Sequence, residues 1–267
     1  MACIHPTAAV APSARLGPEV KIGPYCVVGP DVELDSGVEL VAHVVVEGRT
    51  RIGTGTVIHP FSVIGGPPQH LRYANEPTEL VIGRNCCIRE HVTMNRGTAA
   101  GGGRTTIGDD GFFMAGVHIA HDCHVGAKVI MANQATLGGH VTIGDHVVIG
   151  GLSAVHQHVR VGAHVMIGGL SPVVEDIIPY GMAVGNPVHL SGLNLVGLKR
   201  RGFEREEILL LRAVYRSLFE GPGTFAERVE RTVARYKGEP AAQPLLDFVR
   251  DHAARSLCKP GVRHGRY

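Results

Sequence analysis

The sequence predicts an all-β parallel β-helix followed by a C-terminal helical domain, and three observations support this prediction. An apolar, mostly aliphatic residue recurs with a six-residue period between Ile4 and Val173, apart from two interruptions. Glycines and other small residues recur at fixed offsets from it. The period ends near Pro179, and an amphipathic helical pattern follows. A fixed period of six residues is typical of a solenoid built from short parallel strands.

The repeat keeps one phase from Ile4 to Ile64, resumes at Ile82, and restarts one residue out of phase at Ile107. Three hexapeptides complete a triangular coil, so residues 18 apart stack on successive coils at a spacing of roughly 4.8 Å. The periodic residue points inward and fills the prism. Small residues four places later fit the narrow corners: Ala8, Ala14, Cys26, Ser62, Cys123, Ala135 and Ser153.

Two segments interrupt the repeat, GGPPQHLRYANEPTEL at 65–80 and TAAGGGRTT at 98–106. Long loops that leave a regular solenoid are usually functional. For the second segment, a tolerated surface insertion explains the pattern equally well. We therefore expect a β-helix domain at 1–190 that carries both loops, and a helical domain at 191–267.

The helical domain is expected to contain helices at about 203–220, 224–237 and 243–256, the second opened by a capping box of Thr224 and Glu227. From Gly192 onward there are 15 Lys and Arg against 9 Asp and Glu, a net charge of +6; the whole chain carries +2, so the prism carries −4. This asymmetry favours an acidic partner. A solvated helical face would give the same pattern.

Composition narrows the class of protein. The 267 residues include 36 glycines and no tryptophan, which suits a prism filled with aliphatic rungs. No apolar run reaches 18 residues and no leader precedes the repeat, so we expect no stable membrane insertion. Six cysteines without C-x-x-C spacing indicate reduced thiols and a cytoplasmic protein. We expect no nucleic-acid partner and no cofactor.

Histidines are dense between His118 and His164. Adding 18 to His121 gives Gly139, and adding 36 gives Gln157, so one face should carry His121, Gly139–His140 and His156–Gln157, with His118 nearby. Such a column could bind a metal, supply a general base, or be inert. The remaining histidines of this stretch belong to other positions and are expected at the surface: His124, His146, His158 and His164.

The segments HIAHDCHVG, GGHVTIGD, AVHQ and GLKRRGF, with the loop GGPPQHLRYANEPT, resemble the family of acyl-carrier-protein-dependent UDP-N-acetylglucosamine O-acyltransferases of lipid A biosynthesis. The resemblance covers nearly the whole chain. The related N-acyltransferases carry a separate N-terminal domain, whereas here the repeat begins at residue 4. Known hexapeptide prisms wind left-handed, and the resemblance implies the same handedness here.

The resemblance implies a catalytic centre. His121 corresponds to the base that removes the proton from the sugar 3-hydroxyl, which then attacks the thioester of a (3R)-hydroxyacyl chain on acyl carrier protein. Asp122 corresponds to the residue that orients the base, and the Gly139 N–H to the oxyanion donor. A homotrimer with clefts between neighbouring prisms is expected.

The resemblance also implies binding residues. Substrate contacts correspond to His118, His140, His156 and Gln157, and residues near the nucleotide and carrier phosphates to Asn194, Arg200 and Arg201. Gly169 corresponds to the residue that limits acyl-chain length. No metal site is expected.

The chain departs from the family pattern in the first loop, where Gln69, His70 and Arg72 stand in place of a Q-D-x-K pattern. His70 thus replaces the acidic residue at the acceptor's 3-position, and Arg72 keeps the charge of a lysine. Val196 replaces a glutamate before GLKRR. These changes leave a 3-amino UDP-sugar open as an alternative acceptor; drift with a compensating contact is the other explanation.

An alternative from another class is a trimeric zinc enzyme of the γ-carbonic-anhydrase type. Such a site needs three histidines that converge on one metal across a subunit boundary, and His118 and His121 have plausible spacing. The helical tail and the KRR cluster argue against it. A non-catalytic scaffold would leave the histidine column unexplained.

Overall fold

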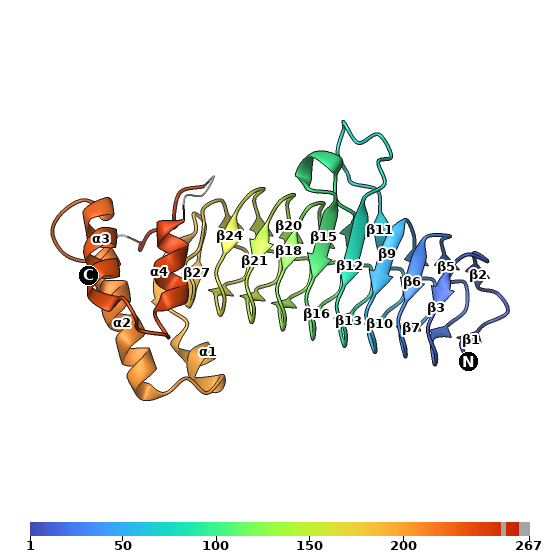
Figure 1. The fold of residues 1–267 in the computed structure, drawn as a ribbon, viewed down its shortest axis with the longest axis horizontal. Helices are drawn as coiled ribbons and strands as arrows, with labels where there is room; N and C mark the ends of the chain where they lie inside the picture. The colour runs from blue at the N-terminus through green and yellow to red at the C-terminus, as the bar shows by residue number, and fades with distance from the viewer. Residues whose placement is uncertain (252–254, 262–267) are drawn as a thin grey trace.

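The chain folds as a three-sided prism of parallel strands capped by helices. A computed structural model describes residues 1–251 and 255–261. Each coil contributes one strand to each of three sheets, and the helices lie beyond the last coil at the opposite end from the N-terminus (Figure 1). Cys3 pairs with Lys21 and Ile4 with Ile22, the predicted offset of 18 residues. The predicted parallel β-helix is therefore confirmed.

The three faces are called sheets A, B and C. Sheet A consists of β1 (Cys3–Ile4), β4 (Lys21–Ile22), β7 (Glu39–Leu40), β10 (Val57–Ile58), β13 (Cys87–Ile88), β16 (Phe112–Phe113), β19 (Ile130–Met131), β22 (Val148–Ile149), β25 (Met166–Ile167), β27 (Gly181–Val184) and β28 (His189–Leu193). Sheet B consists of β2 (Ala9–Val10), β5 (Val27–Val28), β8 (Val45–Val46), β11 (Val63–Gly66), β14 (Thr93–Asn95), β17 (His118–Ile119), β20 (Thr136–Leu137), β23 (Ala154–Val155) and β26 (Pro172–Val173). Sheet C consists of β3 (Arg15–Leu16), β6 (Val32–Leu34), β9 (Arg49–Ile52), β12 (Glu79–Ile82), β15 (Arg104–Ile107), β18 (His124–Val125), β21 (Thr142–Ile143) and β24 (Arg160–Val161).

The periodic residues fill the prism. From Ile22 to Val173 each one is almost completely buried, and each such side chain stabilises the fold by about 1.5–3 kcal/mol. The prediction is wrong for Ile4, which is 44% exposed. Its coil is the outermost of the stack, so no further coil covers that side.

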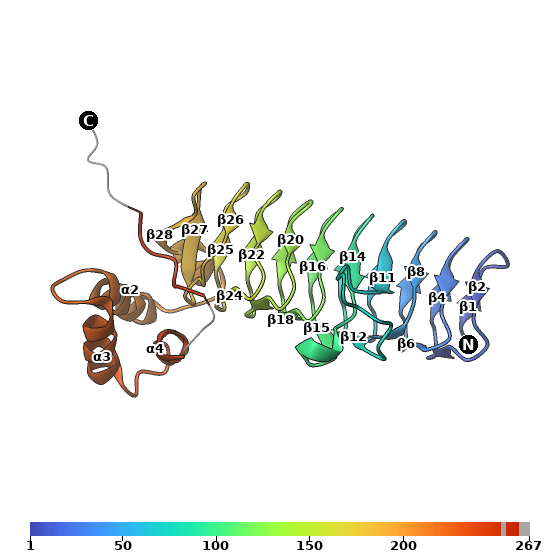
Figure 2. The same ribbon diagram turned by 90° about the horizontal axis from the view of Figure 1, so that it is seen from above.

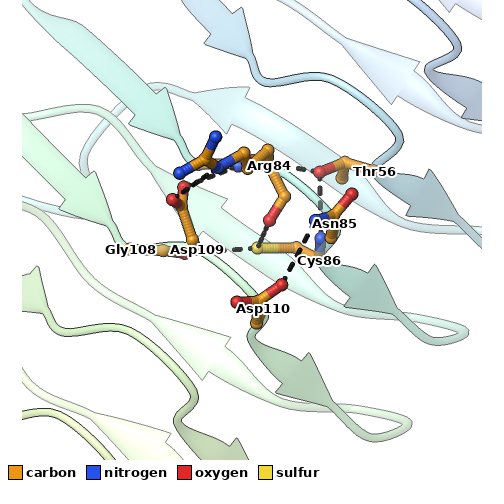
Figure 3. A network of polar contacts seen from close by, with 8 residues as sticks. Thr56, Arg84, Asn85, Cys86, Gly108, Asp109 and Asp110 are labelled. Carbon is orange, nitrogen blue, oxygen red and sulfur yellow. Dashed lines mark hydrogen bonds and ion pairs between the residues drawn. The ribbon is translucent and has the colours of Figure 1, made fainter.

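Polar side chains tie successive coils together at the corners between sheets C and A (Figure 3). Asp109 accepts hydrogen bonds from the Arg84 N–H at 2.9 Å and from Arg84 Nε at 2.8 Å. The Cys86 thiol donates to the Gly108 carbonyl at 3.3 Å, and burial raises the pKa of Cys86 to about 11. Cys86 is thus a protonated packing residue, and all six cysteines are free.

Both interruptions project from the prism side by side, and the second contains the short 3₁₀-helix η1 (Ala99–Gly101) (Figures 1 and 2). Their bases share hydrogen bonds. The Glu79 N–H donates to the Gly103 carbonyl at 2.8 Å, the Gly97 N–H donates to the Glu79 carbonyl at 3.1 Å, and Arg104 forms an ion pair with Glu79 at 2.8 Å. The two loops therefore form one surface feature.

In the part of the chain that the structure describes, four helices follow the antiparallel pair β27–β28: α1 (Leu195–Arg200), α2 (Arg205–Phe219), α3 (Phe225–Tyr236) and α4 (Gln243–Arg250). The capping box forms, with the Glu227 N–H donating to Thr224 Oγ1 at 3.3 Å and the Thr224 N–H donating to Glu227 Oε2 at 2.7 Å. None of the described helices is long and apolar enough to cross a membrane.

Two helix predictions need correction. No helix was expected at 195–200, where the Asn194 side chain accepts a hydrogen bond from the Gly197 N–H and caps α1. The third predicted helix ends at Arg250, six residues early; its positions 252–254 lie outside the described residues. After this gap the chain returns to the prism, where the Asp176 N–H donates to the Ser256 carbonyl at 2.8 Å.

Candidate active site

His121 lies at the corner between sheets B and C, just after β17. The predicted stacking brings Gly139 against it, because a Cβ atom added at Gly139 would lie 2.6 Å from His121 Cε1 and 2.8 Å from Nε2. The His140 N–H donates to the His121 carbonyl at 3.0 Å, and the His158 N–H to the Gly139 carbonyl at 3.1 Å. Residues spaced 18 apart in the sequence are therefore neighbours on successive coils at this corner, as predicted.

His121 and Asp122 form a buried pair. His121 Nδ1 lies 2.8 Å from Asp122 Oδ2, and the two residues are only 5% and 2% exposed. Burial raises the pKa of Asp122, but hydrogen bonds from the Thr98 hydroxyl, from His121 and from the Thr98 N–H outweigh it, so the net pKa is lowered. An ionised carboxylate only accepts hydrogen bonds, so the proton of neutral His121 is on Nδ1. Nε2 then carries a lone pair that can accept a proton.

The second insertion holds this carboxylate in place. The Thr98 N–H donates to Asp122 Oδ1 at 2.8 Å, and the Thr98 hydroxyl donates to Oδ2 at 2.6 Å. The Asp122 N–H donates to Thr105 Oγ1 at 2.8 Å. Sequence reasoning missed both threonines. The sequence feature that could have indicated them is the insertion one coil before His121, which has a threonine near each end.

The rings of several histidines extend the site along the prism. His70, on the first insertion, meets His121 edge-on at a centroid distance of 5.3 Å, and His140 meets it edge-on at 5.2 Å. His158 is exposed, as expected, but its ring stacks on that of His140 at 4.5 Å and so continues the column. Burial lowers the pKa of His140, which favours a neutral ring.

His118 also lies near the pair, in β17, one strand position before the corner. Its Nδ1 is 2.7 Å from the Thr93 hydroxyl, and burial, with a smaller contribution from His121, lowers its pKa. His118 therefore favours the neutral form, which can donate or accept a hydrogen bond but carries no charge.

The Gly139 N–H is free to bind a ligand. Among residues 1–251 and 255–261 it has no hydrogen-bond acceptor. The same hexapeptide position holds proline in other coils, at Pro24, Pro30 and Pro60, because the backbone N–H there does not join the coil's hydrogen bonding. A donor at this point beside Nε2 of His121 suits a negatively charged oxygen that develops during a reaction.

His156 and Gln157 occupy the next coil, where the C-terminal segment contacts them. Arg255 Nη2 donates to His156 Nδ1 at 2.7 Å, and Arg255 Nε donates to the Gln157 carbonyl at 3.1 Å. Because a guanidinium only donates, His156 Nδ1 accepts this bond, and the hydrogen of the neutral ring is on Nε2. Arg255, like Thr98 and Thr105, is a contact that the sequence did not predict.

Comparison with known proteins identifies the family. The family model described as Udp N-acetylglucosamine O-acyltransferase, Domain 2, matches residues 176–258, and the bacterial transferase hexapeptide model matches residues 13–48. The acyl-[acyl-carrier-protein]–UDP-N-acetylglucosamine O-acyltransferase of Caulobacter vibrioides is 60% identical over 257 residues, 96% of this chain and 98% of that protein. The chain belongs to this family of acyltransferases.

Solved structures agree. LpxA from Acinetobacter baumannii has a TM-score of 0.92 at 40% identity, covering 96% of this chain and 99% of that one. The UDP-N-acetylglucosamine acyltransferase of Francisella novicida has a TM-score of 0.94 at 33% identity, covering 97% and 95% of the two chains. The family fold thus extends over both the prism and the helical tail of this acyltransferase.

Some predicted site residues of this acyltransferase lie on a different corner, between sheets C and A. Asn194 Nδ2 donates to the His164 carbonyl at 3.0 Å, and Arg201 donates to the His146 carbonyl at 2.7 Å. His164 was expected at the surface, but it is only partly exposed: it stacks on His146, and burial lowers its pKa to about 4. Arg200 is exposed on α1. One chain does not bring these residues to His121.

The remaining predicted residues lie outside the buried pair. Gln69 and Arg72 are exposed on the first insertion, beside His70. Gly169 lies on the third corner, between β25 of sheet A and β26 of sheet B, where a Cβ would be 3.2 Å from the Gly151 carbonyl oxygen.

The zinc alternative can be tested against the same contacts. His121, Asp122 and His140 each offer one ligand atom, and these atoms lie within 4.8 Å of one another. However, Asp122 Oδ2 already accepts hydrogen bonds from Thr98 and from His121 Nδ1. A metal bound to Oδ2 and Nδ1 would have to break both bonds, so the donor set suits a hydrogen-bonded pair better than a zinc site.

Proposed function

We propose that this protein transfers a (3R)-hydroxyacyl chain from acyl carrier protein to the 3-hydroxyl of UDP-N-acetylglucosamine, the first step of lipid A biosynthesis. The observation that carries the proposal is the buried His121–Asp122 pair, whose Nε2 lone pair lies beside the free N–H of Gly139. Relatives that span nearly the whole chain are named for this acyl transfer. The free thiols and a carrier-protein donor support a cytoplasmic location.

In the proposed mechanism, the sugar 3-hydroxyl donates its proton to His121 Nε2 as its oxygen attacks the thioester carbonyl carbon. The carbonyl oxygen becomes an oxyanion that accepts a hydrogen bond from the Gly139 N–H. The C–S bond then breaks, and the carrier thiol leaves with the proton returned from His121. Ionised Asp122 stabilises the transient imidazolium and holds Nε2 in the direction of the substrate.

We propose a homotrimer of left-handed prisms, with each active site between two neighbours. The support is the distribution of residues over two corners: His121 lies between sheets B and C, whereas Asn194 and Arg201 lie between sheets C and A. A closed three-fold ring can bring one corner of a subunit to a different corner of the next. Arg200 and Arg201 would then meet phosphates across the cleft.

His70 motivates the second acceptor, a 3-amino UDP-sugar. The His70 ring lies edge-on to the His121 ring. In the proposed mechanism the reacting group of the sugar has to sit beside His121, so it would also lie close to His70. An imidazole can accept a hydrogen bond from either a hydroxyl or an amine, but it lacks the negative charge that a carboxylate offers to an ammonium. We therefore retain the 3-hydroxyl acceptor as the main proposal.

The test is a thioester-transfer assay with a (3R)-hydroxyacyl carrier protein and equal concentrations of the two UDP-sugars. The proposal expects an O-acylated UDP-N-acetylglucosamine as the main product, with turnover that chelators leave unchanged. An N-acylated main product would favour the 3-amino acceptor. Absence of transfer to either sugar, or turnover that requires added zinc, would overturn acyl transfer by this pair.

A further inference from the structure

The second insertion contacts the active-site aspartate from both of its ends. Thr98, at its start, donates two hydrogen bonds to the Asp122 carboxylate, and Thr105, at its end, accepts one from the Asp122 N–H. Asp122 itself has a φ of 59°, a left-handed conformation that a side chain other than glycine's adopts at some cost. The insertion therefore holds both the backbone and the carboxylate of a strained residue.

The direction of the Thr98 hydroxyl hydrogen follows from its partners. Thr98 Oγ1 accepts a hydrogen bond from the Gly101 N–H at 3.1 Å, and its one hydrogen is left for Asp122 Oδ2 at 2.6 Å. Thr98 is only 7% exposed, so little water competes for this bond. A short bond to a charged acceptor in a buried place is among the stronger hydrogen bonds in proteins.

The backbone of η1 covers the same carboxylate. A Cβ atom added at Gly101 would lie 2.2 Å from Asp122 Cγ, so only glycine allows the loop to approach this closely. The corners of the next two coils, at His140 and His158, show the same left-handed φ, yet neither is hydrogen-bonded to the insertion. The insertion thus serves one corner only, the one that carries the proposed base.

We infer that Thr98 is a positioning residue for the proposed acyl transfer: it orients the Asp122 carboxylate, which in turn fixes the tautomer and direction of His121. This inference rests on the proposed function. It also gives the insertion at 98–106 a role, where a tolerated surface loop was the other explanation. Because Thr98 acts through two other residues, its loss should lower kcat and leave the binding of UDP-N-acetylglucosamine intact.

The test compares Thr98→Val, which removes the hydroxyl and keeps the shape, with Thr98→Ser, which restores the hydroxyl. Thr106→Val is the matched control, since the Thr106 hydroxyl meets His124 Nδ1 at 2.9 Å and does not contact Asp122. We expect Thr98→Val to lower kcat by about 10- to 100-fold with KM within about twofold of wild type. Thr98→Ser should recover most of kcat, and Thr106→Val should resemble wild type.

A double-mutant cycle excludes a general loss of packing. In an Asp122→Asn background the charged acceptor is gone, so Thr98→Val should lower kcat by less than about threefold further. Equal losses in the Val and Ser variants, full additivity with Asp122→Asn, or a Thr98→Val variant with wild-type kcat would each overturn the inference. A wild-type protein without acyl transfer would instead overturn the proposed function, which separates the two failures.

Discussion

Gly139→Ala tests the close approach of Gly139 to the proposed base. The φ of Gly139 lies outside the left-handed region, so alanine strains no torsion there. The new Cβ would lie 2.6 Å from His121 Cε1, whereas carbon atoms pack at about 3.5–4.0 Å. The imidazole must therefore move by about 1 Å, which lengthens its 2.8 Å hydrogen bond to Asp122. A misplacement of about 1 Å costs on the order of 10²-fold in rate.

We therefore expect kcat/KM for Gly139→Ala to fall by about 10²-fold, equivalent to about 2.7 kcal/mol of transition-state stabilisation. The assay is steady-state thioester transfer, with thermal melting and light scattering to check fold and assembly. Gly151→Ala is the matched control, because its Cβ would meet nothing nearer than the Asn133 carbonyl oxygen at 3.3 Å. A folded Gly139→Ala variant with activity within about threefold of wild type would refute the reasoning.

Three further predictions concern the rest of the chain. Gly169→Met should shift preference towards shorter hydroxyacyl chains in competition assays, because each methylene that finds no room forfeits about 0.8 kcal/mol; an unchanged ratio removes Gly169 from chain-length selection. Arg200→Glu, on an exposed side chain, should raise KM for acyl carrier protein, and added salt should weaken wild-type activity; kinetics that ignore salt would contradict this. Burial lowers the pKa of His164 to about 4 in the folded protein. As the pH falls below about 6.5, His164 is therefore protonated in the unfolded chain but not in the folded one, and the free energy of unfolding should fall by up to about 2 kcal/mol by pH 5. Melting His164→Phe at pH 7 and pH 5 should show a smaller drop than wild type, and an equal drop would contradict the assignment.

The repeat made most of the fold predictable. A period of six fixes which residues point inward, and a coil of three hexapeptides fixes which residues stack, so counting along the sequence was enough to place Gly139 beside His121. The same arithmetic fails at the ends. Ile4 obeys the period yet remains 44% exposed, because burial depends on a neighbouring coil that the pattern itself does not reveal.

The site was less predictable because its support comes from irregular segments. Thr98 and Arg255 reach the column from a loop and from the C-terminal segment, whose paths no periodicity describes. The stacking of His158 on His140 and of His164 on His146 was missed for a related reason: corner residues with left-handed φ stack their rings along the prism, and this stacking depends on backbone conformation. Composition and spacing do not encode it.

Activity of His121→Ala, measured as transfer of a (3R)-hydroxyacyl group from acyl carrier protein to UDP-N-acetylglucosamine, tests the central claim most directly. A general base typically raises the reaction rate by about 10²–10⁴-fold. His121 is not part of the hydrophobic core that fills the prism. The proposed mechanism predicts a folded variant with wild-type assembly and at least about a 10²-fold loss of kcat. A folded variant that retains more than about a tenth of wild-type activity would contradict the role of His121 as the base.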